Sequence, residues 1–138
     1  MTPGTSILVA DDEVEFLESL ARVLGRRGFE VVTACSGAGA VEAASTGSFD
    51  VIILDVRMPG MDGLEALEAI KRISPLTPVL LLTGHADIAI ASAALRSGAS
   101  DFMVKPCPVD DLVTAIENAA EHRALARAAA PDPARERG

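Results

Sequence analysis

Short apolar runs alternate along the chain with longer segments in which apolar residues recur every three or four positions. Residues 51–54 (Val-Ile-Ile-Leu) are the clearest short run, because no polar residue interrupts them. Such a run is typical of a strand that is covered on both faces, as in a parallel sheet. The runs that we interpret as strands span residues 6–10, 29–34, 51–54, 78–83 and 101–105.

The segments between these runs have helical periodicity. The first of them ends before Gly28, and its apolar positions are Val14, Leu17, Leu20, Ala21 and Leu24. The later helices are predicted over residues 37–47, 64–73, 86–98 and 108–128. Five strands that alternate with five helices predict an α/β fold in which helices cover both faces of a parallel sheet. A doubly wound, flavodoxin-like strand order 2-1-3-4-5 fits this length.

The size and composition favour one globular domain. Of the 138 residues, 49% are apolar and 23% are charged, an ordinary globular balance. We expect the domain to span residues 5–128, and the Pro-, Ala- and Arg-rich residues 129–138 to be a flexible tail or linker. No apolar run approaches the ~20 residues of a membrane span, and no signal peptide is visible. We therefore expect a cytoplasmic protein with no membrane partner.

Charge and cysteine content exclude further classes. The formal net charge is −8, and the chain has no Trp or Tyr, so we expect no direct nucleic-acid binding. Cys35 and Cys107 lack the spacing of a metal site, and in a reducing compartment they are expected to be buried thiols rather than a disulfide.

Polar residues end four of the predicted strands. They are Asp11 and Asp12, Asp55, Thr83, and Lys105. Parallel strands bring these residues to one edge of the sheet, where α/β proteins place their chemistry. Clustered carboxylates repel each other unless they share a cation, and a site of oxygen ligands suits Mg²⁺. A lysine and a hydroxyl would suit the oxygens of an incoming phosphoryl group, and a carboxylate can be the nucleophile that accepts it.

Each residue alone also has a plainer interpretation. Asp11 or Asp12 would serve as a helix N-cap, and Asp55 as the first residue of a turn. Thr83 and Lys105 would be an ordinary strand residue and a solvated strand end. Only the set of residues favours a functional site over these alternatives.

Taken together, the motifs resemble the receiver domain of two-component response regulators over about residues 5–125. They are "LVADDE", "ILDVRMPGMDG", "LLLTGHAD" and "GASDFMVKP". The resemblance implies that Asp55 is the phosphoacceptor and that Asp11 and Asp12 hold Mg²⁺, with Asp55 and the backbone carbonyl of Arg57. It implies that Thr83 bonds the phosphoryl oxygen and that Lys105 neutralises its charge.

The same resemblance implies a switch and its partners. Phe102 stands at the position of the family's switch aromatic, and the Lys105–Pro106 bond at that of its cis peptide. A sensor histidine kinase would supply the phosphoryl group. The face formed by the helix over residues 86–98, the strand over 101–105 and the helix over 108–128 would then control an output domain, a partner or a homodimer contact. "TGHADI" and "GASDF" resemble receivers of transcription activators. Such a domain catalyses only its own phosphorylation and dephosphorylation, and we expect no other enzyme activity.

Three other functions are conceivable for an α/β chain of this kind. "GAGAVE" (37–42) fails as a dinucleotide-binding loop, because Glu42 stands where the pattern requires its last glycine. An aspartyl phosphatase would want a second acid two residues after Asp55, where this chain has Arg57. A phosphorylation-independent protein-binding module of the same fold stays open as the alternative function. His85, beside Thr83, is interpreted as a loop residue that tunes dephosphorylation.

Overall fold

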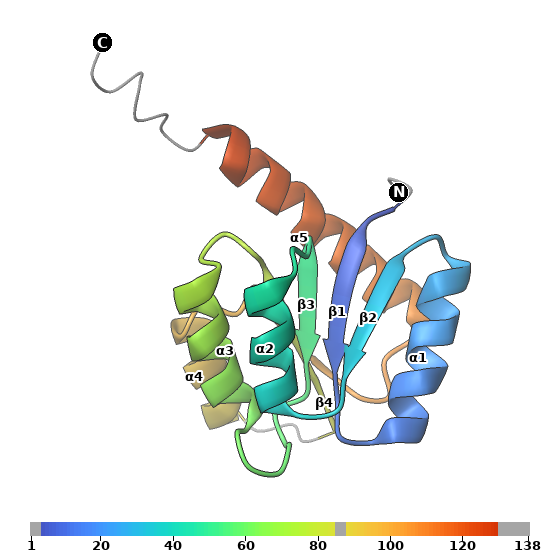
Figure 1. The fold of residues 1–138 in the computed structure, drawn as a ribbon, viewed down its shortest axis with the longest axis vertical. Helices are drawn as coiled ribbons and strands as arrows, with labels where there is room; N and C mark the ends of the chain where they lie inside the picture. The colour runs from blue at the N-terminus through green and yellow to red at the C-terminus, as the bar shows by residue number, and fades with distance from the viewer. Residues whose placement is uncertain (1–3, 85–87, 130–138) are drawn as a thin grey trace.

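The computed structural model describes residues 4–84 and 88–129, with side chains as far as Ala126. Five parallel strands form one sheet in the order β2-β1-β3-β4-β5, which confirms the predicted fold (Figure 1). The strands are β1 (Ser6–Ala10), β2 (Glu30–Ala34), β3 (Val51–Leu54), β4 (Val79–Thr83) and β5 (Asp101–Val104). The helices are α1 (Val14–Arg26), α2 (Gly37–Thr46), α3 (Gly63–Ile73), α4 (Ile88–Arg96) and α5 (Val109–Ala129).

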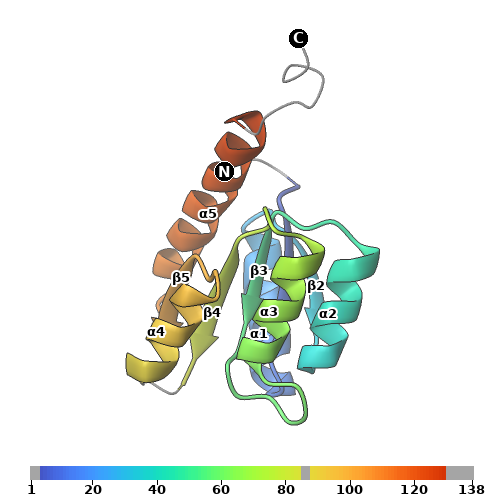
Figure 2. The ribbon, with the colours of Figure 1, turned by 90° about the vertical axis from the view of Figure 1, so that its left-hand side faces the viewer.

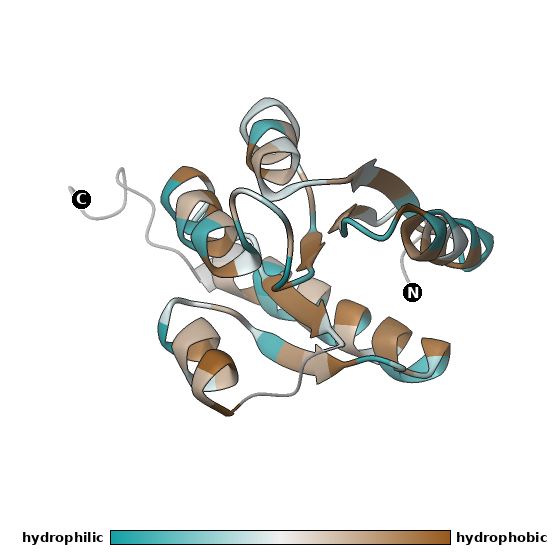
Figure 3. Ribbon diagram, turned by 90° about the horizontal axis from the view of Figure 1, so that it is seen from below, coloured by the Kyte–Doolittle hydropathy of each residue, from teal (hydrophilic) through white to brown (hydrophobic). Residues whose placement is uncertain are grey.

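The sheet lies between two layers of helices, and each layer has its own apolar core (Figures 1 and 2). Helices α2, α3 and α4 cover the face that includes Leu8, Ile52 and Leu54. Helices α1 and α5 cover the face that includes Val9 and Ile53. Successive strand residues point to opposite faces, so strands covered twice must be apolar at every position. This explains the uninterrupted runs, which Figure 3 shows in brown at the centre of the molecule.

The predicted element bounds hold to within about two residues. The helix predicted over residues 86–98 is α4 (Ile88–Arg96), and residues 85–87 lie outside the described residues. In α1 the buried positions are Leu17, Leu20 and Leu24. Val14 has the same spacing, but it is the first residue of the helix and is 51% exposed. The first helix therefore uses a shorter apolar stripe than the sequence predicts.

The cysteine prediction was half wrong. Both thiols are free, as expected, but Cys35 is exposed, because it follows the edge strand β2, and Cys107 is only partly buried. Across the described parts of the chain, no helix combines the length and the apolar character needed to cross a bilayer.

Candidate functional site

Backbone hydrogen bonds beyond the strand ends hold two of the three predicted aspartates, Asp11 and Asp55, at one edge of the sheet. The N–H of Asp11 donates to Ala34 O of β2 (3.1 Å), and the N–H of Asp55 donates to Ala10 O of β1 (3.0 Å). The ladders thus continue one residue past the strands and fix Asp11 and Asp55 at the carboxyl edge. One carboxylate oxygen from each of Asp11, Asp12 and Asp55 lies within 4.8 Å of the others. We call this cluster the acid pocket.

The two inner aspartates of the acid pocket are buried and hydrogen-bonded. Asp11 is 2% exposed and Asp55 5% exposed, whereas Asp12 is exposed. Asp11 Oδ1 accepts from the backbone N–H of Glu13 (2.9 Å), and Asp55 Oδ1 accepts from that of Arg57 (3.1 Å). Each inner carboxylate thus keeps one oxygen on a local backbone donor and turns the other toward the centre of the site.

Lys105 reaches the acid pocket from the far end of β5. Its Nζ donates to Asp11 Oδ2 (2.6 Å) and Asp55 Oδ2 (3.3 Å) and lies 3.4 Å from Glu13 Oε1. Its side chain is only 13% exposed. The backbone N–H of Lys105 donates to Thr83 O (2.7 Å), and the Lys105–Pro106 peptide bond is cis, as the resemblance implies.

Negative charge exceeds positive charge around this ammonium. Burial is the main cause of a raised pKa for Asp11, and the nearby Asp55 raises it further, although the bonds from Lys105 and Glu13 oppose this. Burial alone would lower the pKa of Lys105, but its bonds and attraction to Asp11 and Asp55 outweigh burial and raise it. The site thus stabilises positive charge and penalises further negative charge.

The loop after β3 holds Asp55 against the start of α3. Asp62 and Glu65 form a reciprocal capping box that fixes where α3 begins. A Cβ at Gly63 would lie 2.2 Å from Asp55 O, so no larger residue fits unless the backbone moves. Gly60 adopts φ +78°, a conformation that glycine tolerates best. Both glycines therefore serve the turn and the helix start.

The remaining predicted residues lie around the same edge. Thr83 ends β4 and is fully buried. Phe102, on β5, is half-buried and packs against the core under α2, α3 and α4. Arg57 borders an open hollow of about 570 Å³ that adjoins the acid pocket at Asp12. His85 lies outside the described residues.

The plainer interpretations explain only part of this geometry. Glu13, not Asp11 or Asp12, is the N-cap of α1, and it makes no side-chain cap bond. Asp55 does form a local turn bond to the Arg57 N–H, yet it also faces Lys105. Lys105 is buried among carboxylates and is therefore not a solvated strand end.

Sequence reasoning missed two neighbours of Lys105. Glu13 is the third acid of "DDE", but the sequence does not indicate that its exposed side chain reaches Lys105. Phe16 lies outside the apolar stripe of α1, and nothing in the sequence indicated that Lys105 Nζ would lie 4.1 Å from the centre of its ring.

The donor set fits a hard divalent cation. Three carboxylates offer oxygens close to one another, and Mg²⁺ prefers oxygen ligands from one or two carboxylates with water completing its shell. The exposed side of the cluster, at Asp12, leaves room for such waters. The acid pocket is therefore compatible with Mg²⁺.

Comparisons with known proteins agree on one family. A model of the response regulator receiver domain matches residues 7–117. The C4-dicarboxylate transport transcriptional regulatory protein DctD of Rhizobium meliloti is 36% identical over 125 residues, which are 91% of this chain but 27% of DctD. The chain thus spans about a quarter of the length of that relative.

Two solved structures resemble the chain over most of their own length. A response regulator receiver domain protein from Clostridium thermocellum is 37% identical, with a TM-score of 0.81, over 88% of this chain and 98% of that one. A response regulator from Burkholderia pseudomallei, with a phosphorylated aspartic acid, calcium ion and citrate, is 33% identical, with a TM-score of 0.78. That match covers 92% of this chain and 75% of the neighbour.

Proposed function

This chain belongs to the response regulator receiver domain family of two-component systems, and we propose that Asp55 is its phosphoacceptor and that Mg²⁺ is its cofactor. Receivers are signalling domains that histidine kinases phosphorylate. The observation that carries the proposal is that Asp55 Oδ2 faces Lys105 Nζ at 3.3 Å inside a cluster of three carboxylates. A constitutive binding module would have no need of this buried, charge-strained arrangement.

In phosphoryl transfer, the main contribution of the protein would be to position the reacting groups. A carboxylate oxygen of Asp55 forms a bond to phosphorus as the bond to the phosphohistidine nitrogen breaks. The electron pair returns to that nitrogen, which takes up a proton. Lys105 then balances charge on the phosphoryl oxygens, and Thr83 bonds one of them. The phosphorylated aspartic acid in the Burkholderia neighbour supports this assignment, because the two chains share fold and family.

Mg²⁺ would be held by Asp11, Asp12 and Asp55 and by the backbone carbonyl of Arg57. When bound, it would neutralise charge that builds up during phosphoryl transfer. Without the bound cation, the carboxylates outnumber the single ammonium of Lys105 and would oppose the approach of an anion. Asp11 and Asp12 therefore act as holders of the cation, and slow hydrolysis of the aspartyl phosphate would reset the domain.

The output would pass through the face formed by α4, β5 and α5. The new phosphoryl charge would draw Thr83 and Lys105 inward and let Phe102 turn toward the core. Within the described residues, these elements carry the exposed apolar side chains Ile88 (87%), Leu95 (52%), Val104 (42%) and Leu125 (61%), and they support a partner or homodimer contact. In a longer regulator like DctD, that contact would control transcription through another domain.

Three further predictions from the sequence belong to the same proposal. The receiver would span residues 5–128, with residues 129–138 as a tail or linker. It would work in the cytoplasm. It would not bind nucleic acid itself, because its formal charge is −8.

Intact mass after incubation with a small-molecule acyl phosphate tests the proposal. We expect an increment of one phosphoryl group, about 80 Da, that requires Mg²⁺ and disappears in Asp55→Asn. Asp50→Asn is the matched control, because Asp50 precedes β3 whereas Asp55 follows it. An increment that persists in Asp55→Asn would contradict the assignment. No increment at all would favour the phosphorylation-independent binding module.

A further inference from the structure

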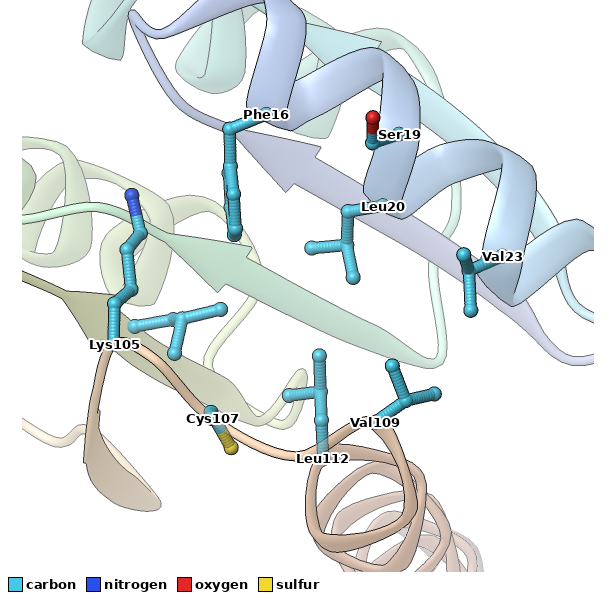
Figure 4. Close-up of a pocket in the computed structure, with 9 residues that line it drawn as sticks. Phe16, Ser19, Leu20, Val23, Lys105, Cys107, Val109 and Leu112 are labelled. Carbon is cyan, nitrogen blue, oxygen red and sulfur yellow. The ribbon is translucent and has the colours of Figure 1, made fainter.

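The ammonium of Lys105 contacts an aromatic ring as well as its carboxylates. Nζ lies 4.1 Å from the centre of the Phe16 ring, within the range of a cation–π interaction. Phe16 belongs to the first turn of α1, whereas Lys105 follows β5, so the contact joins two distant parts of the chain. Figure 4 shows the lysine extending along one end of an apolar groove, with its nitrogen beside the ring.

The groove restricts where the lysine can go. It has a volume of about 170 Å³ and lies between α1 and the start of α5, with walls that include Leu20, Leu82 and Leu112. Lys105 also lines this groove, and its charged end is directed to the carboxylates. Phe16 stands where the groove meets the acid pocket, so its ring limits the positions open to Nζ.

A ring and a carboxylate hold an ammonium in different ways. Asp11 Oδ2 takes up an N–H donor at 2.6 Å, and such a bond must weaken before that donor can serve a phosphoryl oxygen. The ring face attracts the charge without needing any of the three N–H donors. It thus steadies Nζ near Asp55 and leaves its hydrogen-bonding capacity available.

We propose that Phe16 is a positioning residue, which holds the Lys105 ammonium at the acid pocket during phosphoryl transfer to Asp55. The inference rests on the proposed function, because it assumes that Asp55 accepts a phosphoryl group. Phe16 acts through Lys105 and has no contact of its own with the phosphoryl group. Its loss should slow the reaction without abolishing it.

The test compares Phe16→Leu with Phe16→Tyr. Leucine keeps an apolar side chain in the groove but removes the ring face, and tyrosine restores the ring. We expect the initial phosphorylation rate with an acyl phosphate and Mg²⁺ to fall about two- to fivefold in Phe16→Leu, and Phe16→Tyr to match the original chain. Val23→Ala is the control, because Val23 lines the far end of the groove from Lys105 (Figure 4).

An NMR measurement reports the contact without any phosphorylation. The ring should shift the proton signals next to Lys105 Nζ, which are identified by their loss in Lys105→Gln. We expect this shift in the original chain, in Phe16→Tyr and in Val23→Ala, and its loss in Phe16→Leu.

The outcomes separate the inference from the proposed function. An unchanged phosphorylation rate in Phe16→Leu would overturn the inference whether or not the NMR shift is lost, while the phosphoacceptor role of Asp55 would stand. A slower rate in Phe16→Leu that tyrosine does not restore would also overturn it. If the original chain takes up no phosphoryl group, the proposed function fails and the inference fails with it.

Discussion

Two aspartates lie at opposite ends of the same short strand and have opposite surroundings. Asp50 precedes β3 and Asp55 follows it. Asp50 Oδ2 accepts from the Ser6 N–H (2.9 Å), and its Oδ1 lies 3.4 Å from Arg123 Nη1 of α5. Its side chain is 40% exposed, whereas that of Asp55 is 6% exposed. At the amino end the carboxylate is paired and partly solvated, and at the carboxyl end it is buried beside other carboxylates.

The difference teaches that residue type alone does not decide what an aspartate does, because the end of the strand at which it lies decides which charges surround it. Asp50 joins β1, β3 and α5 through one backbone donor and one guanidinium, so its charge is compensated within the fold. Asp55 shares Lys105 with Asp11 and Glu13, so the charge there is not compensated by the fold alone. A charge that the fold leaves uncompensated is available to bind a cation and to respond to modification.

The sharpest test of this comparison is the effect of Mg²⁺ on stability. At a concentration about 100 times its Kd, Mg²⁺ should raise the free energy of unfolding by about 2.7 kcal/mol. Asp12→Ala should abolish this gain, and Asp50→Ala should keep it, because Asp12 belongs to the acid pocket at the carboxyl end of β3 and Asp50 does not. Urea unfolding with and without Mg²⁺ measures both. Loss of the gain in Asp50→Ala as well would show that the two ends do not differ in this way.

We expect the next largest effect on the free energy of unfolding when Asp50, the paired aspartate, is removed. Asp50→Ala leaves the Ser6 N–H without this acceptor and Arg123 without this counter-charge. Because Asp50 is partly solvated, we expect a loss of about 1–2 kcal/mol in the free energy of unfolding.

An exposed ion pair provides the matched control for Asp50. Asp110 lies only 2.8 Å from Arg27, yet the Asp110 side chain is 84% exposed, so Asp110→Ala should change stability little. Equal losses in Asp50→Ala and Asp110→Ala, measured by urea unfolding, would mean that Asp50 is an ordinary surface aspartate.

The sequence predicted the strand order and sheet edge that form the site better than it predicted the different roles of Asp50 and Asp55. The strand order and the residues at the carboxyl edge were predictable, because strands covered on both faces appear as apolar runs and their last polar residues converge. Asp50 and Asp55 both flank the run of residues 51–54, and only the strand direction separates them. The partner of Asp50 is Arg123, 73 residues away, and no local pattern connects the two.

The surroundings of Lys105 show the same limit. The parallel order of the strands predicted that Lys105 would lie near Asp11 and Asp55. Its contacts with Glu13 and Phe16 depend on how α1 is rotated and on the path of a long side chain through a groove. Such contacts arise from packing across the fold, and periodicity along the chain does not encode them.

Neutralising one inner carboxylate should stabilise the protein in the absence of Mg²⁺. The pKa of Asp11 is raised chiefly by burial, so its charged form costs folding energy at neutral pH. We expect Asp11→Asn to raise the free energy of unfolding, by an amount on the order of 1 kcal/mol, the size of one close charge–charge interaction. Asp50→Asn should lower it. Urea unfolding in the presence of a chelator measures both changes. A loss of stability in Asp11→Asn would contradict the conclusion that negative charge is in excess at the acid pocket.

The gain in the free energy of unfolding that we expect from Asp11→Asn should depend on pH. The folded state holds the Asp11 proton up to a higher pH than the unfolded state does, because the folded pKa is the raised one. In that window the folded state binds more protons, so stability increases as pH falls. The original chain should therefore approach the stability of Asp11→Asn as the pH is lowered from 7 through the raised pKa of Asp11. Asp12, Glu13, Asp55 and Lys105 face the same site and are retained in both proteins, so the difference between the two unfolding curves reports Asp11 and its interactions with these groups. A gap that stayed constant or widened as the pH fell would mean that Asp11 is compensated within the fold, as Asp50 is.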